Sequence, residues 1–197
     1  MRRVIDVTLA ALSLVFLLPV MLVAVVGIWM SDPGPALFCA SRVGKNGRVF
    51  TMHKFRTMRR VAGPRITTGR DPRVFGWGRL LRATKIDELP QLIDILCGHM
   101  AIIGPRPEDP TISEAVTDPR WKMILKYRPG LVSPGALLVY RIDHRDDVDD
   151  PEQFYLDRVL PRKITLDLCF LQQRSWRRDL GILCETAVMV LRRVRAA

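Results

Sequence analysis

The chain has 197 residues, of which 48% are apolar, and it carries 31 Lys and Arg against 20 Asp and Glu. This length suffices for one domain with a core of its own, and the net charge of +11 indicates anionic partners such as nucleic acid, anionic lipid or phosphate-bearing substrates. Four cysteines without C-x-x-C spacing and three scattered histidines exclude a disulfide framework and a zinc site, and they fit a reducing compartment.

The first predicted element is an apolar segment at 7–30 that contains no charged residue. It is longer than the about 20 residues that a spanning helix needs, and no signal-peptide cleavage site follows it. Pro19 lies at its centre, where proline removes a backbone hydrogen bond and bends a helix. Arg2 and Arg3 precede the segment and further basic residues follow from Arg42 onward, so the positive-inside tendency places both ends in the cytoplasm. The pattern favours a segment that enters the bilayer and returns, with a single span as the alternative.

A turn rich in Pro and Gly ends the apolar segment. Short strands are predicted at 36–39 and 48–53, joined by a hairpin-type turn at 44–47. A polar loop at 59–71 then leads to a short amphipathic helix at 73–82.

Two adjacent carboxylates, Asp87 and Glu88, directly precede a short helical pattern that ends at Gly98. Because free backbone N–H groups at a helix start favour negative charge, capping is the simplest interpretation of the two acids. The neighbouring charge favours a second interpretation. Between residues 31 and 86 thirteen Lys and Arg stand against two acids, an excess as large as the net charge of the whole chain. An ionised Asp in such a basin suits a nucleophile that attacks phosphorus, since carboxylates form acyl phosphates.

After the carboxylate pair, Gly-Pro-Arg-Pro at 104–107 forms a rigid turn that presents the guanidinium of Arg106. The remaining predicted elements are a helix at 119–126, a turn at 127–130, an acidic loop at 143–152 without calcium-hand spacing, and helices at 163–173 and 179–195. The last helix is amphipathic, and it either lies at a membrane surface or covers the core.

Several short motifs follow the membrane segment in order: Asp-Pro-Gly-Pro at 32–35, Arg-Val-Gly-x-x-Gly at 42–47, Lys-Phe-Arg-Thr-Met at 54–58, Asp-Glu-Leu-Pro-Gln-Leu at 87–92 and Gly-Pro-Arg-Pro at 104–107. With these motifs the chain resembles the bacterial sugar transferases, the monotopic phosphoglycosyltransferases that act on polyprenyl phosphate. The resemblance covers nearly the whole chain, from about Arg2 to the C-terminal helices.

The resemblance implies transfer of a sugar 1-phosphate from a nucleoside diphosphate sugar, usually a UDP-sugar, to undecaprenyl phosphate, with release of UMP and with Mg²⁺ as cofactor. It implies that Asp87 attacks the β-phosphate to form a covalent phosphosugar intermediate, and that Glu88 is its catalytic partner. Either carboxylate is a candidate magnesium ligand, and Arg82 and Arg106 are expected to bind phosphate. The resemblance also implies that a re-entrant membrane helix anchors the protein and that the protein is active at the cytoplasmic face of the bacterial inner membrane.

Three more basic residues are candidates for phosphate binding. Lys54 and Arg56 alternate along a predicted strand and so share one face, where they contact phosphate or lipid headgroups, or are ordinary surface charges. Arg128 precedes Pro129, and it contacts substrate or braces the turn.

The chain departs from the family pattern at several positions. His99 stands where members usually carry Asp, Ala40 and Ser41 precede Arg42 where members have Gln-x-Arg, and Leu-Val-Ser at 131–133 replaces Ile-Thr-Gly. None of these changes touches the expected catalytic residues. The change at 131–133 falls where substrate-facing loops are expected, so it bears on donor preference.

The sequence therefore predicts an α+β fold, predominantly helical with a small β-hairpin. Residues 1–31 form a re-entrant membrane helix-break-helix, and residues 32–197 form a cytosolic catalytic domain that initiates a lipid-linked glycan at the inner leaflet. The alternative is a non-catalytic, membrane-anchored basic module that binds anionic lipid, which would need the basic stretch but not Asp87 and Glu88. A homologue that has lost activity is a third hypothesis, and a homodimer through the C-terminal helices is a further one. Nucleic acid is not expected, because the basic stretch adjoins a membrane segment and carries no nucleic-acid motif.

Overall fold

The structure, a computed structural model, describes residues 2–63, 71–142 and 150–196. Most of the predicted polar loop at 59–71 and most of the predicted acidic loop at 143–152 lie outside the described residues. The other predicted elements can be compared directly with the structure.

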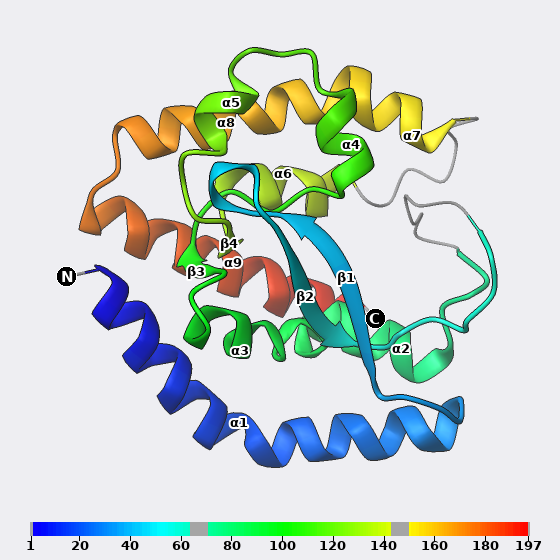
Figure 1. The fold of residues 1–197 in the computed structure, drawn as a ribbon. Coiled ribbons are helices and arrows are strands. Elements are labelled where there is room, and N and C mark those ends of the chain that lie inside the picture. Colours follow the sequence, from blue (N-terminus) through cyan, green and yellow to red (C-terminus); the bar gives the residue numbers. More distant parts are fainter. Residues whose placement is uncertain (1, 64–70, 143–149, 197) are drawn as a thin grey trace.

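One long helix, α1 (Arg2–Ser31), forms the N-terminal element, and its length and apolar composition would allow it to cross a membrane. Pro19 is the only proline inside it, and Figure 1 shows α1 bent in its middle part. Proline bends helices because it donates no hydrogen bond to the preceding turn. The predicted break thus takes the form of a bend within one continuous helix.

Both arms of α1 lie against the rest of the chain. The first arm buries Ala10 in a cluster with Met52, Leu92, Ile95 and Met100. The second arm buries Ala24 and Ile28 in a cluster with Phe55, Phe75 and Leu81. The opposite side of the helix is also apolar but exposed, and Val15, Phe16 and Met30 are each at least 70% exposed. The helix therefore has one face fitted to the domain and another that the described chain leaves uncovered.

The predicted hairpin is confirmed. Strands β1 (Leu37–Val43) and β2 (Val49–Phe55) pair antiparallel, with Val43 opposite Val49 and Leu37 opposite Phe55. In the turn between them Asn46 and Gly47 have φ angles of 59° and 76°, a backbone region that Asn and Gly enter more readily than other residues. The strands are longer than predicted because the pairing continues through the arginine-bearing end of β1.

A second strand pair was not predicted. Strands β3 (Ala101–Ile103) and β4 (Gly130–Val132) run parallel, and β4 begins in the stretch predicted as a turn. Gly104 and Gly130 allow this approach, because a Cβ on Gly130 would lie 2.2 Å from the backbone nitrogen of Gly104. The amide of Gly130 donates to the carbonyl oxygen of Pro105 at 3.0 Å, so β4 holds the turn that carries Arg106.

The remaining elements are helices: α2 (Gly76–Thr84), α3 (Gln91–Leu96), α4 (Pro110–Ala115), α5 (Trp121–Ile124), α6 (Pro134–Ile142), α7 (Pro151–Phe154), a π-helical turn (Tyr155–Val159), α8 (Leu160–Gln172) and α9 (Trp176–Ala196). Helix α8 buries Leu160, Ile164, Leu168 and Leu171 at helical spacing against Trp121 of α5 and its neighbours. Figure 1 shows α8 along the top of the domain, α9 passing behind the hairpin and α1 along the bottom. The predicted class, α+β and mainly helical, is confirmed, although α4, α6 and α7 were not predicted.

Candidate active site

Asp87 and Glu88 lie in a 3₁₀ turn, Ile86–Glu88, between α2 and α3. Lys85 ends α2 and opens this turn in the left-handed region, with φ 60° and ψ 13°. A non-glycine residue in that region costs about 1 kcal/mol or more, and such residues gather at functional sites. The same kink places the side chain of Lys85 beside Glu88.

Both carboxylate oxygens of Glu88 are occupied. Arg106 donates from Nη2 to Oε1 at 2.8 Å and from Nη1 to Oε2 at 3.1 Å. The hydroxyl of Tyr140 donates to Oε1 at 3.0 Å, and Nζ of Lys85 lies 3.3 Å from the same oxygen. The two-pronged guanidinium contact is the strongest arrangement available to a carboxylate. Glu88 is therefore held by side chains, and the interpretation of this residue as a helix cap is wrong.

Burial alone would raise the pKa of Glu88. The charges of Arg106 and Lys85, together with the hydrogen bonds from Arg106 and Tyr140, outweigh burial and hold the pKa of Glu88 well below its usual range. Glu88 is consequently a fixed negative charge at any pH near neutrality.

Asp87 has the opposite surroundings. Its side chain is buried, and within the described chain its Oδ1 has no hydrogen-bond partner. Burial and the charge of Glu88 raise the pKa of Asp87 to about 6, against the opposing charges of Lys85, Lys54 and Arg82. The other buried side-chain atoms that lack a partner among the described residues are both polar atoms of Gln91, four positions further along. Such atoms are uncommon in folded proteins, and the unpartnered oxygen of Asp87 is therefore a candidate contact for an incoming group.

Three further cations surround the pair. Lys54 at the end of β2 is near enough to Asp87 and Arg82 for each to influence its charge, and burial with the charge of Arg82 lowers the pKa of Lys54 to about 8. Arg82 of α2 donates from Nε to the hydroxyl of Thr57 at 2.8 Å. Lys85 stacks on the ring of Tyr140, 3.1 Å from its centroid. The predicted residues Lys54, Arg82 and Arg106 are thus brought together around Asp87 and Glu88.

The turn that carries Arg106 is supported from behind. Lys163 of α8 is buried, and its Nζ donates to the carbonyl oxygen of Arg106 at 2.9 Å and to the carboxylate of Glu108. The hydroxyl of Tyr155 donates to Glu108 at 2.6 Å. These contacts hold the main chain at Arg106 and just after it.

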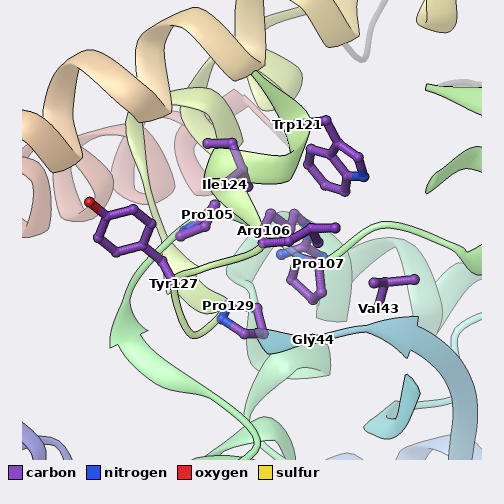
Figure 2. Close-up of a pocket in the computed structure, with 10 residues that line it drawn as sticks. Val43, Gly44, Pro105, Arg106, Pro107, Trp121, Ile124, Tyr127 and Pro129 are labelled. Carbon is purple, nitrogen blue, oxygen red and sulfur yellow. The ribbon is translucent and has the colours of Figure 1, made fainter. Parts of the chain in front are cut away.

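A small pocket lies beside the same turn (Figure 2). It is lined by Val43, Gly44, Pro105, Arg106, Pro107, Trp121, Ile124, Leu125, Tyr127 and Pro129. Its lining is mainly apolar and contains neither Asp87 nor Glu88. We regard it as packing space between the Arg106 turn and α5.

Two predicted phosphate-binding residues lie in other surroundings. Arg56 directly follows β2, and its buried guanidinium donates to the carbonyl oxygen of Pro35 at 2.7 Å and pairs with Asp32. Lys54 and Arg56 therefore contact different partners. Arg128 lies near enough to Asp6 of α1 to influence its charge. Arg56 holds the turn after α1, and the contacts of Arg56 and Arg128 do not join them to the cationic cluster around Glu88.

The departures from the family pattern also lie outside the contacts of the pair. His99 is exposed, with its ring 5.6 Å from that of Phe50. Leu131 and Val132 form part of β4, and the hydroxyl of Ser133 accepts a hydrogen bond from the amide of Ala136 at 3.0 Å. These residues shape the scaffold under the Arg106 turn.

Three residues near the pair, Tyr140, Lys163 and Arg193, were not predicted from the sequence. Tyr140 contacts Glu88, Lys163 contacts Arg106, and Arg193 contacts Tyr140. None of the three lies in a recognised motif. The only signal in the sequence was the basic run near the C-terminus, which was interpreted as one face of an amphipathic helix.

Comparison with known proteins supports the resemblance. The model of the bacterial sugar transferase family matches residues 1–193. A UDP-glucose:undecaprenyl-phosphate glucose-1-phosphate transferase from Caulobacter vibrioides is 35% identical over 96% of this chain and 69% of that protein. A protein with the same name from Xanthomonas campestris is 33% identical over 94% of this chain and 38% of its own length. An undecaprenyl-phosphate galactose phosphotransferase from Salmonella typhimurium is 29% identical over 98% of this chain and 41% of its own length.

The chain thus spans less than half of two of these relatives and about two thirds of the third. The family match, in contrast, covers nearly every residue of the chain and includes Asp87, Glu88 and Arg106. On this match, the chain belongs to the bacterial sugar transferase family.

Proposed function

We propose that the protein transfers a sugar 1-phosphate from a UDP-sugar to undecaprenyl phosphate, releases UMP and so initiates a lipid-linked glycan. The observation that carries this proposal is the division between the two carboxylates. Glu88 is saturated with donors, whereas Asp87 is buried among cations with an oxygen that has no partner in the described chain. The names of the relatives supply the substrate classes.

Asp87 is the nucleophile in the proposed reaction. One of its carboxylate oxygens forms a bond to the β-phosphorus of the UDP-sugar, the bond from that phosphorus to the bridging oxygen breaks, and UMP leaves with the bridging oxygen. An oxygen of undecaprenyl phosphate then attacks the same phosphorus, the acyl-phosphate bond breaks, and the Asp87 carboxylate is restored. The site admits the two substrates in turn, so ping-pong kinetics are expected.

The surrounding cations have a clear use in such a reaction. Both substrates are polyanions, and positively charged groups fixed in place offset charge as the transition state forms. Lys54, Arg82 and Lys85 act on the charge of Asp87, and Arg106 fixes Glu88. We assign Glu88 the part of holding Arg106 in position rather than that of a base, because both of its oxygens are already occupied.

Mg²⁺ is part of the proposal. Magnesium in phosphate-handling sites binds one or two carboxylates and substrate phosphates and keeps several waters. The described residues contain no group of three or more His, Cys, Asp and Glu that would form a complete protein cage. The oxygen of Asp87 that lacks a partner fits a magnesium ion that arrives with a diphosphate, whereas Glu88 has no oxygen to spare. When bound, the ion would make UMP a better leaving group.

The membrane part of the proposal concerns α1. We propose that α1 enters the inner leaflet from the cytoplasmic side and returns to it. Arg3 at its start donates to the carbonyl oxygen of Leu96 at 3.1 Å, and the carbonyl oxygen of Ala24 near its end accepts from Trp77 at 3.2 Å. A straight spanning helix could not keep both arms on one cytosolic domain. Reagents confined to the cytoplasmic side should therefore reach residues at both ends of α1.

The alternative is a non-catalytic basic module that binds anionic lipid. Such a module would need the basic stretch, but it would have no use for a buried carboxylate whose pKa is raised. A homologue without activity would keep the fold and fail to turn over any donor. The two alternatives and the proposal predict different outcomes in one assay.

That assay measures UMP release from a panel of UDP-sugars by the full chain in detergent, with and without undecaprenyl phosphate and Mg²⁺. The Asp87→Asn variant should lose release entirely, and Asp157→Asn, which changes an exposed carboxylate, should retain it. Lipid-dependent release from one donor would support the proposal and identify the sugar. Absence of release from every donor by folded protein, or full release by Asp87→Asn, would refute it.

A further inference from the structure

Two residues outside the motifs contact the immediate surroundings of the catalytic pair. Tyr140 lies on α6 and its hydroxyl reaches Oε1 of Glu88, 52 positions away in sequence, at 3.0 Å. Arg193 lies near the end of α9, and its guanidinium donates to the main-chain carbonyl oxygen of Tyr140. The contacts therefore run without a gap from the C-terminal helix to Glu88.

The ring of Tyr140 is surrounded by positive charge. Nζ of Lys85 lies 3.1 Å from the ring centroid, and Cζ of Arg106 and Cζ of Arg193 each lie 5.5 Å from it. An aromatic face attracts cations, and the attraction is stronger in a buried site than in water. Tyr140 is itself buried. The ring therefore holds the cationic side chains apart while its hydroxyl contacts the carboxylate between them.

Arg193 is distinguished from its neighbours by the side of α9 on which it lies. Arg193 is half-buried and contacts α6, whereas Arg192 and Arg195 are exposed. The exposed side of α9 also carries Leu180 and Leu191, each at least 60% exposed. One guanidinium of the basic C-terminal run is thus directed into the domain, and two others are available as controls.

We infer that Tyr140 and Arg193 are positioning residues of the active site: Arg193 holds Tyr140, and Tyr140 holds Glu88 on Arg106, so that Asp87 remains the one carboxylate open to the substrate. This inference rests on the proposed function. It also makes Arg193, near the end of α9, part of the support of the active site, although Arg193 lies about 100 positions from the pair.

The physical reason is the number of donors on one oxygen. Oε1 of Glu88 accepts from Arg106 and Tyr140 and lies near Lys85, and the three directions together fix the carboxylate. Without the hydroxyl of Tyr140, Glu88 can rotate, and Arg106 moves with it. A displacement of about 1 Å in a catalytic site can cost about a hundredfold in rate.

The test compares kinetic constants of UMP release in full-length variants. Tyr140→Phe keeps the ring and removes the hydroxyl, and Arg193→Gln removes the guanidinium. Each should lower kcat by about tenfold to a hundredfold while KM for the UDP-sugar changes less than about threefold, because positioning affects the transition state more than ground-state binding. Arg193→Lys, which can still donate to the carbonyl of Tyr140, should recover most of the rate. Arg192→Gln and Arg195→Gln remove the same charge from the exposed side and should match the wild type.

A second measurement does not depend on turnover. Tyr140→Phe should lower the melting temperature by a few degrees in the wild-type background, because a buried carboxylate loses a donor. In a Glu88→Ala background the same substitution should cost less than half of that shift, since the hydroxyl no longer has this partner.

Two outcomes would overturn the inference. In the first, the wild type releases UMP, but Tyr140→Phe and Arg193→Gln have the same kcat as Arg192→Gln, or differ from it only in KM. This result would leave the proposed function intact. The other is melting losses that simply add in the Glu88→Ala background. A wild type that releases no UMP from any donor would refute the proposed function, and the melting comparison would still decide whether Tyr140 holds Glu88.

Discussion

Asp87 and Glu88 are adjacent in sequence but lie in opposite surroundings. The region around Glu88 is saturated, with donors from Arg106 and Tyr140 on its two oxygens. The region around Asp87 is buried but incomplete, and its Oδ1 has no partner in the described chain. The pKa of Glu88 is lowered and that of Asp87 is raised, although burial acts on both in the same direction.

The difference teaches that burial does not by itself decide the state of a carboxylate. The number and kind of donors around it decide, and the same elements supply them unequally to two neighbours. Glu88 is held in place by its donors. Asp87 is buried without a full set of partners, which lowers the stability of the fold. Four changes would break or sharpen this comparison.

The largest effect is expected for Arg106→Leu, which removes both prongs from Glu88. Breaking a buried pair leaves an uncompensated charge and should cost about 3–5 kcal/mol of the free energy of unfolding. UMP release should fall about a thousandfold, since a fixed cation at a phosphoryl centre is lost. Arg106→Lys keeps the charge but cannot make the two-pronged contact, so its activity and stability should lie between those of the wild type and Arg106→Leu. Activity within tenfold of the wild type would contradict the assignment.

The next comparison separates two predicted phosphate ligands. Lys54→Gln should lower kcat/KM by about tenfold to a hundredfold, because Lys54 lies in the charge field of Asp87. Arg56→Gln should change kcat/KM less than about threefold, but it should lower stability by about 1–3 kcal/mol, since Asp32 and the carbonyl of Pro35 lose their donor. Steady-state kinetics and thermal unfolding of both variants test this. An equal kinetic loss for both would return Arg56 to the substrate site.

A smaller effect is expected from pH. Asp87 must be ionised to attack, and its pKa is raised to about 6, so kcat/KM for the first half-reaction should rise with pH up to about 6 and then level off. One unit below that value the rate should be about tenfold lower. Stoichiometric UMP release without the lipid acceptor is the appropriate measurement, because it excludes titration of the acceptor phosphate. A rate that stays constant down to pH 4 would contradict the raised pKa.

The smallest effect is a gain in stability from Asp87→Asn. A carboxyl whose folded pKa lies above its unfolded value destabilises the fold as pH rises through the interval between them, here about 4 to 6. The asparagine variant avoids that loss, which is about 2.7 kcal/mol for two pKa units, but it buries an amide in place of the carboxyl. It should therefore be more stable than the wild type by about 1–2 kcal/mol above pH 6, with no gain below pH 4. Thermal unfolding across this pH range measures it.

Asp94 offers the matched control. It is also buried, but it accepts from the amide of His53 at 2.9 Å and lies 2.7 Å from Nδ1 of the same residue. Asp94→Asn should therefore lower stability where Asp87→Asn raises it. The same sign for both substitutions would show that Asp87 is not the incomplete site.

The hairpin, the terminal helices and the Asp87-Glu88 turn could be read from the sequence because each depends on a short stretch of it. Strand alternation with a Gly-Lys-Asn-Gly turn identifies β1 and β2, and apolar spacing identifies α8 and α9. Asp87 and Glu88 could be recognised from their motif and from the basic stretch before them. The same reasoning placed Arg56 beside Lys54, whereas the structure gives the Arg56 guanidinium different partners, Asp32 and the carbonyl of Pro35.

The missed features depend on packing between distant segments. Strand β4 has three residues and is defined by its pairing with β3. The local sequence of β4 does not predict that pairing. Tyr140 lies 52 positions from Glu88, and Lys163 lies 57 positions from Arg106. Nothing in the sequence near these residues distinguishes them from an ordinary buried tyrosine or lysine, so their role becomes visible only when α6 and α8 are in place.

The way α1 docks has a consequence for how the chain is made. The residues that cover Ala10 and Ala24 lie in or beside β2, α2 and α3, and they are synthesised after α1. If α1 enters the bilayer as it emerges, two of the hydrophobic clusters can close only on a helix that is already inserted. Insertion would then be a step in the maturation of the domain, and a fragment expressed without α1 would expose Met100, Phe55 and Leu81 to water instead of yielding a soluble enzyme.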